Sequence, residues 1–70
     1  DLEKKEIRAG RKKPKICELC KELRKTVFDH NHKTGKFRGW ICYKCNLALG
    51  FVNDNINLLK LMISYIEKNS

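Results

Sequence analysis

The feature that most constrains this chain is a set of four cysteines, which form two Cys-x-x-Cys pairs within only 70 residues. A chain of this length buries only about 60% of the surface of its unfolded state, so a core alone gives marginal stability and some cross-link is expected. Two such pairs can bring four thiolates around one ion in the tetrahedral arrangement of a structural zinc site. The 21 residues between the pairs slightly exceed the common spacing, and a β-hairpin can absorb the excess. The predicted ligands of one Zn2+ per chain are Cys17, Cys20, Cys42 and Cys45.

Two alternatives would use the same cysteines. Disulfide bonds require an oxidising compartment, which nothing in the sequence indicates, and two redox-active pairs in so short a chain would be unusual. Four thiolates leave no open coordination position, so the predicted zinc would stabilise the fold and take no part in chemistry.

The charge of the chain is strongly positive and unevenly distributed. The formal net charge is +8; residues 1–50 carry fourteen basic and six acidic side chains, whereas residues 51–70 carry two of each. A basic surface suits a phosphate backbone, so nucleic acid is the expected partner, and solubility or non-specific adhesion is the alternative. No apolar run approaches the roughly 18 residues that a membrane span requires, so no membrane association is expected.

The sequence predicts one domain, 1–70, with three parts: a basic N-terminal helix and arm (1–15), a zinc and catalytic core (16–50) and a C-terminal packing helix (51–70). The first helix is expected over residues 1–9, with Gly10 ending it. The basic run that follows is either a solvated linker or an arm that grips phosphates. Its candidate DNA contacts are Lys12, Lys13 and Lys15.

Within the core, the residue pattern predicts a hairpin followed by a short helix. Residues 25–28 and 37–41 have strand character, and Gly35 supplies the positive φ of the connecting loop. The second cysteine pair is expected to run into a helix over residues 46–49, which Gly50 ends.

The last helix is expected to begin at a cap formed by Asn53 or Asp54 and to reach about Glu67. Its apolar residues follow the spacing of three and four that gives one buried helix face. Packing against the core is the simpler explanation, and a dimer contact is the alternative, so a monomer and a homodimer are both compatible with the sequence. The face consists of Ile56, Leu59, Met62, Ile63 and Ile66, widened by Leu58, Leu61 and Tyr65.

Between the cysteine pairs, Asp29-His30-Asn31-His32 joins the first strand to the loop. Hydrolysis of a phosphodiester needs an activated water, neutralisation of the developing charge and assistance to the departing oxygen. An imidazole can take the proton of the water, and a divalent cation with oxygen ligands can supply the other two. Asp29 and Asn46 carry the hard oxygens that Mg2+ prefers.

Each of these residues also has a simpler explanation. Asp29 can cap a turn, His30 and His32 can be exposed loop residues or ligands of a second metal, and Asn46 can cap a helix. Neighbouring strand residues also point to opposite faces, so Asp29 and His30 can share a site only where the strand twists or ends.

The run from Asp29 to Asn46, followed by Leu49-Gly50, resembles the signature DHxHxTGxxRGxxCxxCNxxLG of the recombination endonuclease VII family, which has an upstream Cys-x-x-Cys pair. The resemblance extends over roughly residues 17–65. It implies a small α+β, zinc-stapled ββα-metal (His-Me finger, or HNH) domain, with a β-hairpin and helices around a four-cysteine zinc site. It also implies cutting of DNA that depends on Mg2+ or Mn2+, in the cytoplasm of a bacterium or a phage-infected host.

The resemblance also implies roles for single residues. His30 would be the general base, His32 an auxiliary catalytic residue, and Asp29 and Asn46 the ligands of the catalytic metal, while Arg38 would contact the DNA backbone. Where HNH proteins have a middle asparagine this chain has Gly39, so a backbone carbonyl is a candidate for orienting His30.

Endonuclease VII itself is a longer, intertwined dimer that resolves branched DNA. The expectation for this chain is therefore nicking or cutting of DNA with low sequence specificity. The competing class is a non-catalytic zinc module that binds nucleic acid; it explains the charge and the cysteines equally well, but not the joint presence of Asp29, His30 and Asn46.

Overall fold

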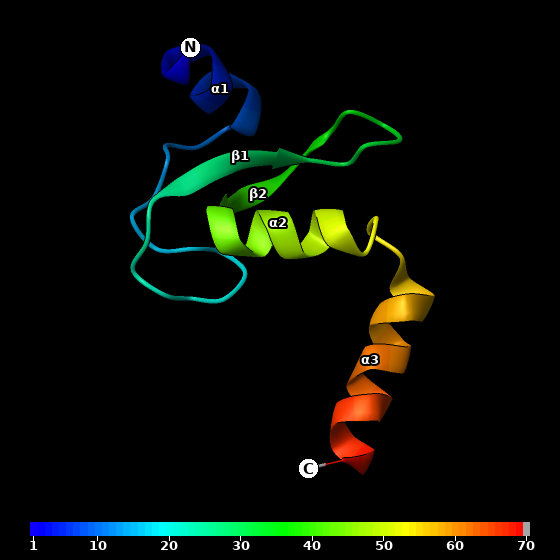
Figure 1. Ribbon diagram of the computed structural model, residues 1–70. Coiled ribbons are helices and arrows are strands. Elements are labelled where there is room, and N and C mark those ends of the chain that lie inside the picture. Colours follow the sequence, from blue (N-terminus) through cyan, green and yellow to red (C-terminus); the bar gives the residue numbers. More distant parts are fainter. Residues whose placement is uncertain (70) are drawn as a thin grey trace.

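The computed structural model describes residues 1–69. Its elements are α1 (Leu2–Ala9), β1 (Thr26–His30), β2 (Phe37–Cys42), α2 (Tyr43–Phe51) and α3 (Ile56–Lys68). The two strands form an antiparallel hairpin, α1 and α2 lie on opposite sides of it, and α3 extends away from the rest (Figure 1). This is the small α+β arrangement that the sequence predicts.

The N-terminal helix begins and ends where local signals place it. The side chain of Asp1 caps its first turn, and Gly10, with φ 76°, ends it in the left-handed conformation that glycine adopts without strain. No residue of α1 is buried. The helix and the segment after it instead contact the hairpin through guanidinium groups over aromatic rings, each 4.8 Å from the ring centroid: Arg8 over Phe28 and Arg11 over Phe37.

Both strands are longer than predicted. The first continues through Asp29 and His30, and the second continues to Cys42. The loop between them closes on Gly35, with φ 76°, whose N–H donates to the carbonyl of Asn31 at 2.7 Å. The predicted hairpin is confirmed, and Asp29, His30 and His32 lie at its loop end, where β1 enters the loop.

The two faces of the hairpin carry different side chains, as the alternation along a strand requires. One face presents an aromatic cluster in which the rings of Phe28, Phe37 and Trp40 have centroids 5.0–6.0 Å apart. The other face carries Ile41, which packs with the cysteines and with Leu49 of α2. The core of this small fold is therefore built largely around the cysteine cluster.

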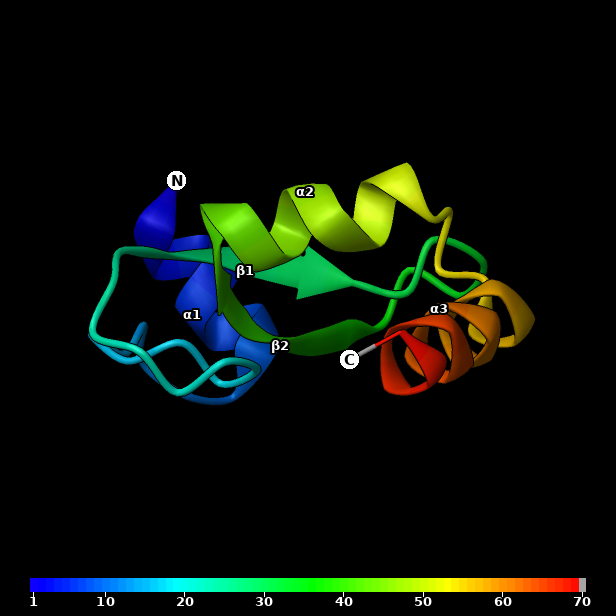
Figure 2. The same cartoon turned by 60° about the horizontal axis from the view of Figure 1, so that its bottom comes forward.

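The predicted limits of α2 are wrong at both ends. The helix begins at Tyr43, directly after strand β2, and continues through Gly50 to Phe51. A glycine inside a helix costs about 1 kcal/mol relative to alanine. Packing along the hairpin, which Figures 1 and 2 both show, and burial of Cys45 offset this cost.

The expectation for the last helix is wrong in two respects. Asn55 caps α3 by accepting from the N–H of Leu58, whereas Asn53 and Asp54 form a tight turn before it. Further, α3 has no buried residue, so its apolar face does not pack on the core of residues 1–69. The helix lies at the opposite end of the hairpin from α1 (Figure 2). Within the described part of the chain, no helix is long and apolar enough to span a bilayer.

Candidate metal centre and active site

The four cysteines converge at one point. It lies between the turn that carries the first Cys-x-x-Cys pair (residues 17–20, the first knuckle), the end of β2 and the start of α2. Their sulfur atoms all lie within 4.8 Å of one another, and the Cys17–Cys45 and Cys20–Cys42 pairs are both 3.9 Å apart. A tetrahedral ion with metal–sulfur bonds of about 2.3 Å requires sulfur atoms about 3.8 Å apart, whereas a disulfide requires about 2.05 Å. All four thiols are free. The cluster is therefore positioned to bind one metal ion.

Backbone N–H groups support negative charge on Cys17. Its Sγ accepts from the N–H of Leu19 at 3.4 Å, of Cys20 at 3.3 Å and of Cys42 at 3.2 Å. Burial alone would raise the pKa of this thiol, but these N–H groups more than compensate and lower it to about 6. In the folded knuckle these N–H groups therefore favour the thiolate form of Cys17, which is the form that binds a cation.

The other cysteines show what a cation would contribute. Burial, together with the neighbouring thiols, raises the pKa of Cys45 to about 12. Like charges this close disfavour one another, so the four groups can ionise together only when a positive ion compensates them. The sulfur-only ligand set favours a soft or borderline cation such as Zn2+.

Asp29 is a buried carboxylate, with its side chain only 6% exposed. A β-bulge lies beside it: Asp29 pairs with Gly39 and His30 with Phe37, which leaves Arg38 as the extra residue of β2. The guanidinium of Arg38 turns onto Asp29, donating through Nε to Oδ2 at 2.7 Å and through Nη2 to Oδ1 at 3.2 Å. The bulge thus makes Arg38 the immediate partner of Asp29, the predicted metal ligand, and its contact with DNA stays a prediction.

The two histidines lie at the end of β1 and in the loop that follows. The ring of His30 lies 6.4 Å from that of Phe28, on the aromatic side, and 4.9 Å from that of His32. Asp29 instead borders a hollow that also includes Ile41 and Leu49. Asp29 and His30 are therefore adjacent but face different sides of the hairpin. Among residues 1–69 no backbone carbonyl binds the His30 ring, so the expected orienting group is not found there.

Asn46 is half-buried in α2, directly after Cys45. Residues three apart share a helix face, so Asn46 lies on the same face as Leu49, which borders the hollow beside Asp29. Asn46 and Asp29 therefore both lie on the side of the hairpin that α2 covers. In the described part of the chain, no hydrogen bond joins their side chains.

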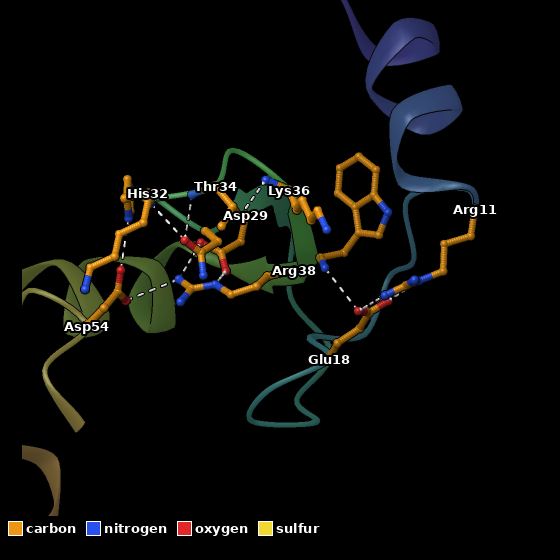
Figure 3. A network of polar contacts seen from close by, with 11 residues as sticks. Arg11, Glu18, Asp29, His32, Thr34, Lys36, Arg38 and Asp54 are labelled. Carbon is orange, nitrogen blue, oxygen red and sulfur yellow. Dashed lines mark hydrogen bonds and ion pairs between the residues drawn. The ribbon is translucent and has the colours of Figure 1, made fainter. Parts of the chain in front are cut away.

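A chain of polar contacts connects these residues to one that the sequence did not single out for the site (Figure 3). Asp54 accepts from His32 Nδ1 through Oδ2 at 3.0 Å and from Arg38 Nη2 through Oδ1 at 3.2 Å. The hydrogen bond from His32 and the contact with Arg38 lower the pKa of Asp54, although partial burial opposes them. The sequence suggests Asp54 only as a helix cap, and no local motif distinguishes it.

A second carboxylate that the sequence left unassigned holds the first knuckle to the sheet. Glu18 pairs with Arg11 and accepts from the N–H of Trp40 at 3.1 Å (Figure 3). The hydrogen bond from Arg11 lowers the pKa of Glu18, and the Trp40 N–H adds to this against the effect of burial. Lys12, Lys13 and Lys15 remain exposed on the neighbouring segment.

A β-hairpin followed by a helix, with an Asp-His pair at the end of the first strand and an asparagine on the helix, is the arrangement of a ββα-metal domain. The model of the recombination endonuclease VII family matches residues 2–68, and the chain belongs to this family.

Comparison with individual proteins agrees with this assignment. The fold is similar to the crystal structure of the beta-beta-alpha-Me type II restriction endonuclease Hpy99I, with a TM-score of 0.80 and 32% identity, covering 100% of this chain and 43% of that chain. The gene 59 proteins of Mycobacterium phages D29 and L5 are 42% identical over 55 residues and 40% identical over 53. These matches cover 76% and 73% of this chain but 33% and 32% of the phage proteins, so the chain spans about a third of their length.

Proposed function

We propose that residues 1–70 form a single nuclease module that hydrolyses phosphodiester bonds of DNA with low sequence specificity. The observation that carries the proposal is that Asp29 and His30, at the end of β1, His32, in the loop that follows, and Asn46, on α2, occupy the signature positions of the endonuclease VII family in a chain that belongs to it. Since the similar gene 59 proteins come from phages, the proposed site of action is a phage-infected bacterial cell.

The residues present fit an oxygen-bound catalytic cation. The carboxylate of Asp29 has about four lone-pair positions, of which Arg38 uses two, so Asp29 retains capacity for a metal. The amide oxygen of Asn46 would be the second protein ligand, and Mg2+ commonly takes only one or two. When bound there, a Mg2+ or Mn2+ ion would neutralise charge at the scissile phosphate and assist the departing 3′ oxygen.

The side chains themselves would perform the proton transfer and the positioning. His30 would take the proton of the attacking water as general base. His32, whose side chain is 65% exposed, can reach a phosphate group above the loop. Arg38 would keep the negative charge of Asp29 compensated before the cation binds, and its remaining N–H groups are available to a phosphate oxygen.

The cysteine cluster would bind Zn2+ and serve a separate role. With four sulfur ligands it leaves no coordination position for substrate. Because Cys42 and Cys45 flank the start of α2, the ion would fix the helix that carries Asn46. DNA would be held through the basic N-terminal half, with Lys12, Lys13 and Lys15 as phosphate contacts.

The test is a plasmid-nicking assay on the purified chain with Mg2+ or Mn2+. We expect supercoiled plasmid to be nicked or linearised, and His30→Ala to lower the rate by about 10²–10⁴-fold, the usual contribution of general-base catalysis. Duplex DNA affinity without added Mg2+ should be unchanged, since one imidazole adds little to the attraction of sixteen basic side chains.

The His30→Ala protein, purified identically, controls for a contaminating nuclease. If folded wild type cuts no DNA with any divalent metal, or if His30→Ala cuts equally well, the chain is the non-catalytic nucleic-acid-binding module instead.

A further inference from the structure

The turn between α2 and α3 holds Asp54 in an unusual backbone conformation. Asn53 and Asp54 have φ values of 52° and 54°, in the left-handed region that residues with a Cβ rarely adopt. Such a conformation persists only where the surrounding structure enforces it. Here the N–H of Asp54 donates to the carbonyl of Leu49 at 3.0 Å, and that of Asn53 to Gly50 at 3.1 Å.

This turn directs the Asp54 carboxylate back into the candidate site. Its two oxygens receive different partners: His32, from the hairpin loop, and Arg38, from β2. Arg38 in turn holds Asp29 (Figure 3). The Asp54 side chain is 26% exposed, between the open His32 at 65% and the buried Asp29 at 6%. Asp54 therefore connects the exposed His32 in the loop, through Arg38, to the buried Asp29.

The chemistry of the contact fixes the protonation pattern of His32. An ionised carboxylate only accepts hydrogen bonds, so the imidazole nitrogen that faces Asp54 must carry the proton. A neutral His32 then has its hydrogen on Nδ1 and its lone pair on Nε2, the nitrogen left for solvent or substrate. A partner that orients a functional histidine in this way commonly affects activity without touching the substrate.

We propose that Asp54 is a positioning residue of the active site, which sets the Nδ1–H form of His32 and holds Arg38 against Asp29. The catalytic part of this inference rests on the proposed function. The part that concerns the His32 ring does not.

Asp54→Asn is the informative substitution. Asparagine tolerates the left-handed conformation, so the turn should be retained. Its side chain offers one oxygen and one NH2 group in place of two acceptors. The charged Arg38 is a donor only and takes the oxygen, which leaves the NH2 group facing His32 and requires an unprotonated Nδ1. The substitution should therefore move the proton of neutral His32 from Nδ1 to Nε2.

Two measurements test the proposal. Side-chain 15N NMR on the zinc-loaded chain should show His32 as the Nδ1–H form in wild type and mainly as the Nε2–H form in Asp54→Asn. In plasmid cleavage, Asp54→Asn should lower kcat by about 10–100-fold, the usual effect of losing such a partner, with KM little changed. Asn57→Ala is the matched control, because Asn57 borders the hollow that His32, Arg38 and Asp54 also line; it should change neither the His32 signals nor kcat.

Each outcome is decisive for Asp54. An Nε2–H form of His32 in wild type, or the same form in both proteins, overturns the proposal. So does a shift of the His32 proton with no change in kcat. If wild type cuts no DNA, the nuclease proposal fails by itself, and the 15N signals still show whether Asp54 sets the state of His32.

Discussion

Removal of the metal from the four-cysteine site should unfold the chain. The buried apolar side chains among residues 1–69 are few, and half of them are cysteines: Cys17, Trp40, Ile41, Cys42, Cys45 and Val52. Without a cation, the three buried cysteines no longer hold the knuckle, the strand end and α2 together. What remains is a very small core.

The magnitudes indicate a complete loss of structure. At about 0.05–0.15 kcal/mol per residue, a domain of this length has a total stability of roughly 3.5–10 kcal/mol. Structural Zn2+ sites bind with apparent free energies of about 10–16 kcal/mol at pH 7, and that binding energy is also folding energy. The expected contribution of the ion thus equals or exceeds the whole stability of the domain, so the metal-free chain should have none.

The assay follows the metal and the fold together. A strong chelator is added at pH 7 under reducing conditions, which prevent disulfide formation; released zinc is measured with a colorimetric indicator, and the fold with circular dichroism and Trp40 fluorescence. Trp40 is only 1% exposed, so unfolding should shift its emission to longer wavelength. We expect one zinc per chain and simultaneous loss of both signals. Full release of the metal with Trp40 still buried and the helices intact would refute the structural role.

Three further predictions concern DNA, the second metal and acid. Replacing Lys12, Lys13 and Lys15 by glutamine should flatten the dependence of log K for duplex DNA on log salt by up to about 2.7, since each phosphate contact contributes about 0.9; an unchanged slope would exclude this run from the interface. Asn46→Ala should raise the Mg2+ concentration needed for half-maximal cleavage by about 10-fold or more while one zinc stays bound, and loss of zinc would contradict the assignment. Arg11 lowers the pKa of Glu18 in the folded chain below its ordinary value of 4.5. The ionised Glu18 therefore stabilises the fold fully above about pH 4.5, and this stabilisation is lost as the pH falls through the lowered pKa of the folded state. The free-energy difference of unfolding between wild type and Glu18→Gln, at equal metal saturation, should therefore shrink on acidification, and a difference that grew would contradict this sign.

The features that depend on local chemistry could be predicted from the residues alone. The spacing of the cysteines predicted a single four-sulfur site, because short knuckles bring their thiols together in almost any context. Gly10 and Gly35 predicted a helix end and a hairpin loop, because both have the positive φ that glycine favours. The family signature singled out Asp29, His30 and Asn46; the structure has the first two at the end of β1 and the third on α2, and their catalytic roles stay predictions.

Tertiary packing decided the limits of α2 and the position of α3, which the residue pattern did not predict. The helix α2 passes through Gly50 because contacts along the hairpin outweigh the weak propensity of one glycine. The periodicity of α3 correctly indicated an apolar face, but periodicity does not say what covers that face, and within residues 1–69 nothing buries it.

The polar network of the site also came only from the tertiary structure. Asp54 lies 22 residues from His32 and 16 from Arg38 in the chain. Its contacts depend on a β-bulge that turns Arg38 onto Asp29 and on two left-handed residues that turn the carboxylate inward. Neither arrangement has a local sequence signal, because each is set by how the hairpin and the α2–α3 turn fit together, and a contact between segments so far apart exists only after the chain has folded.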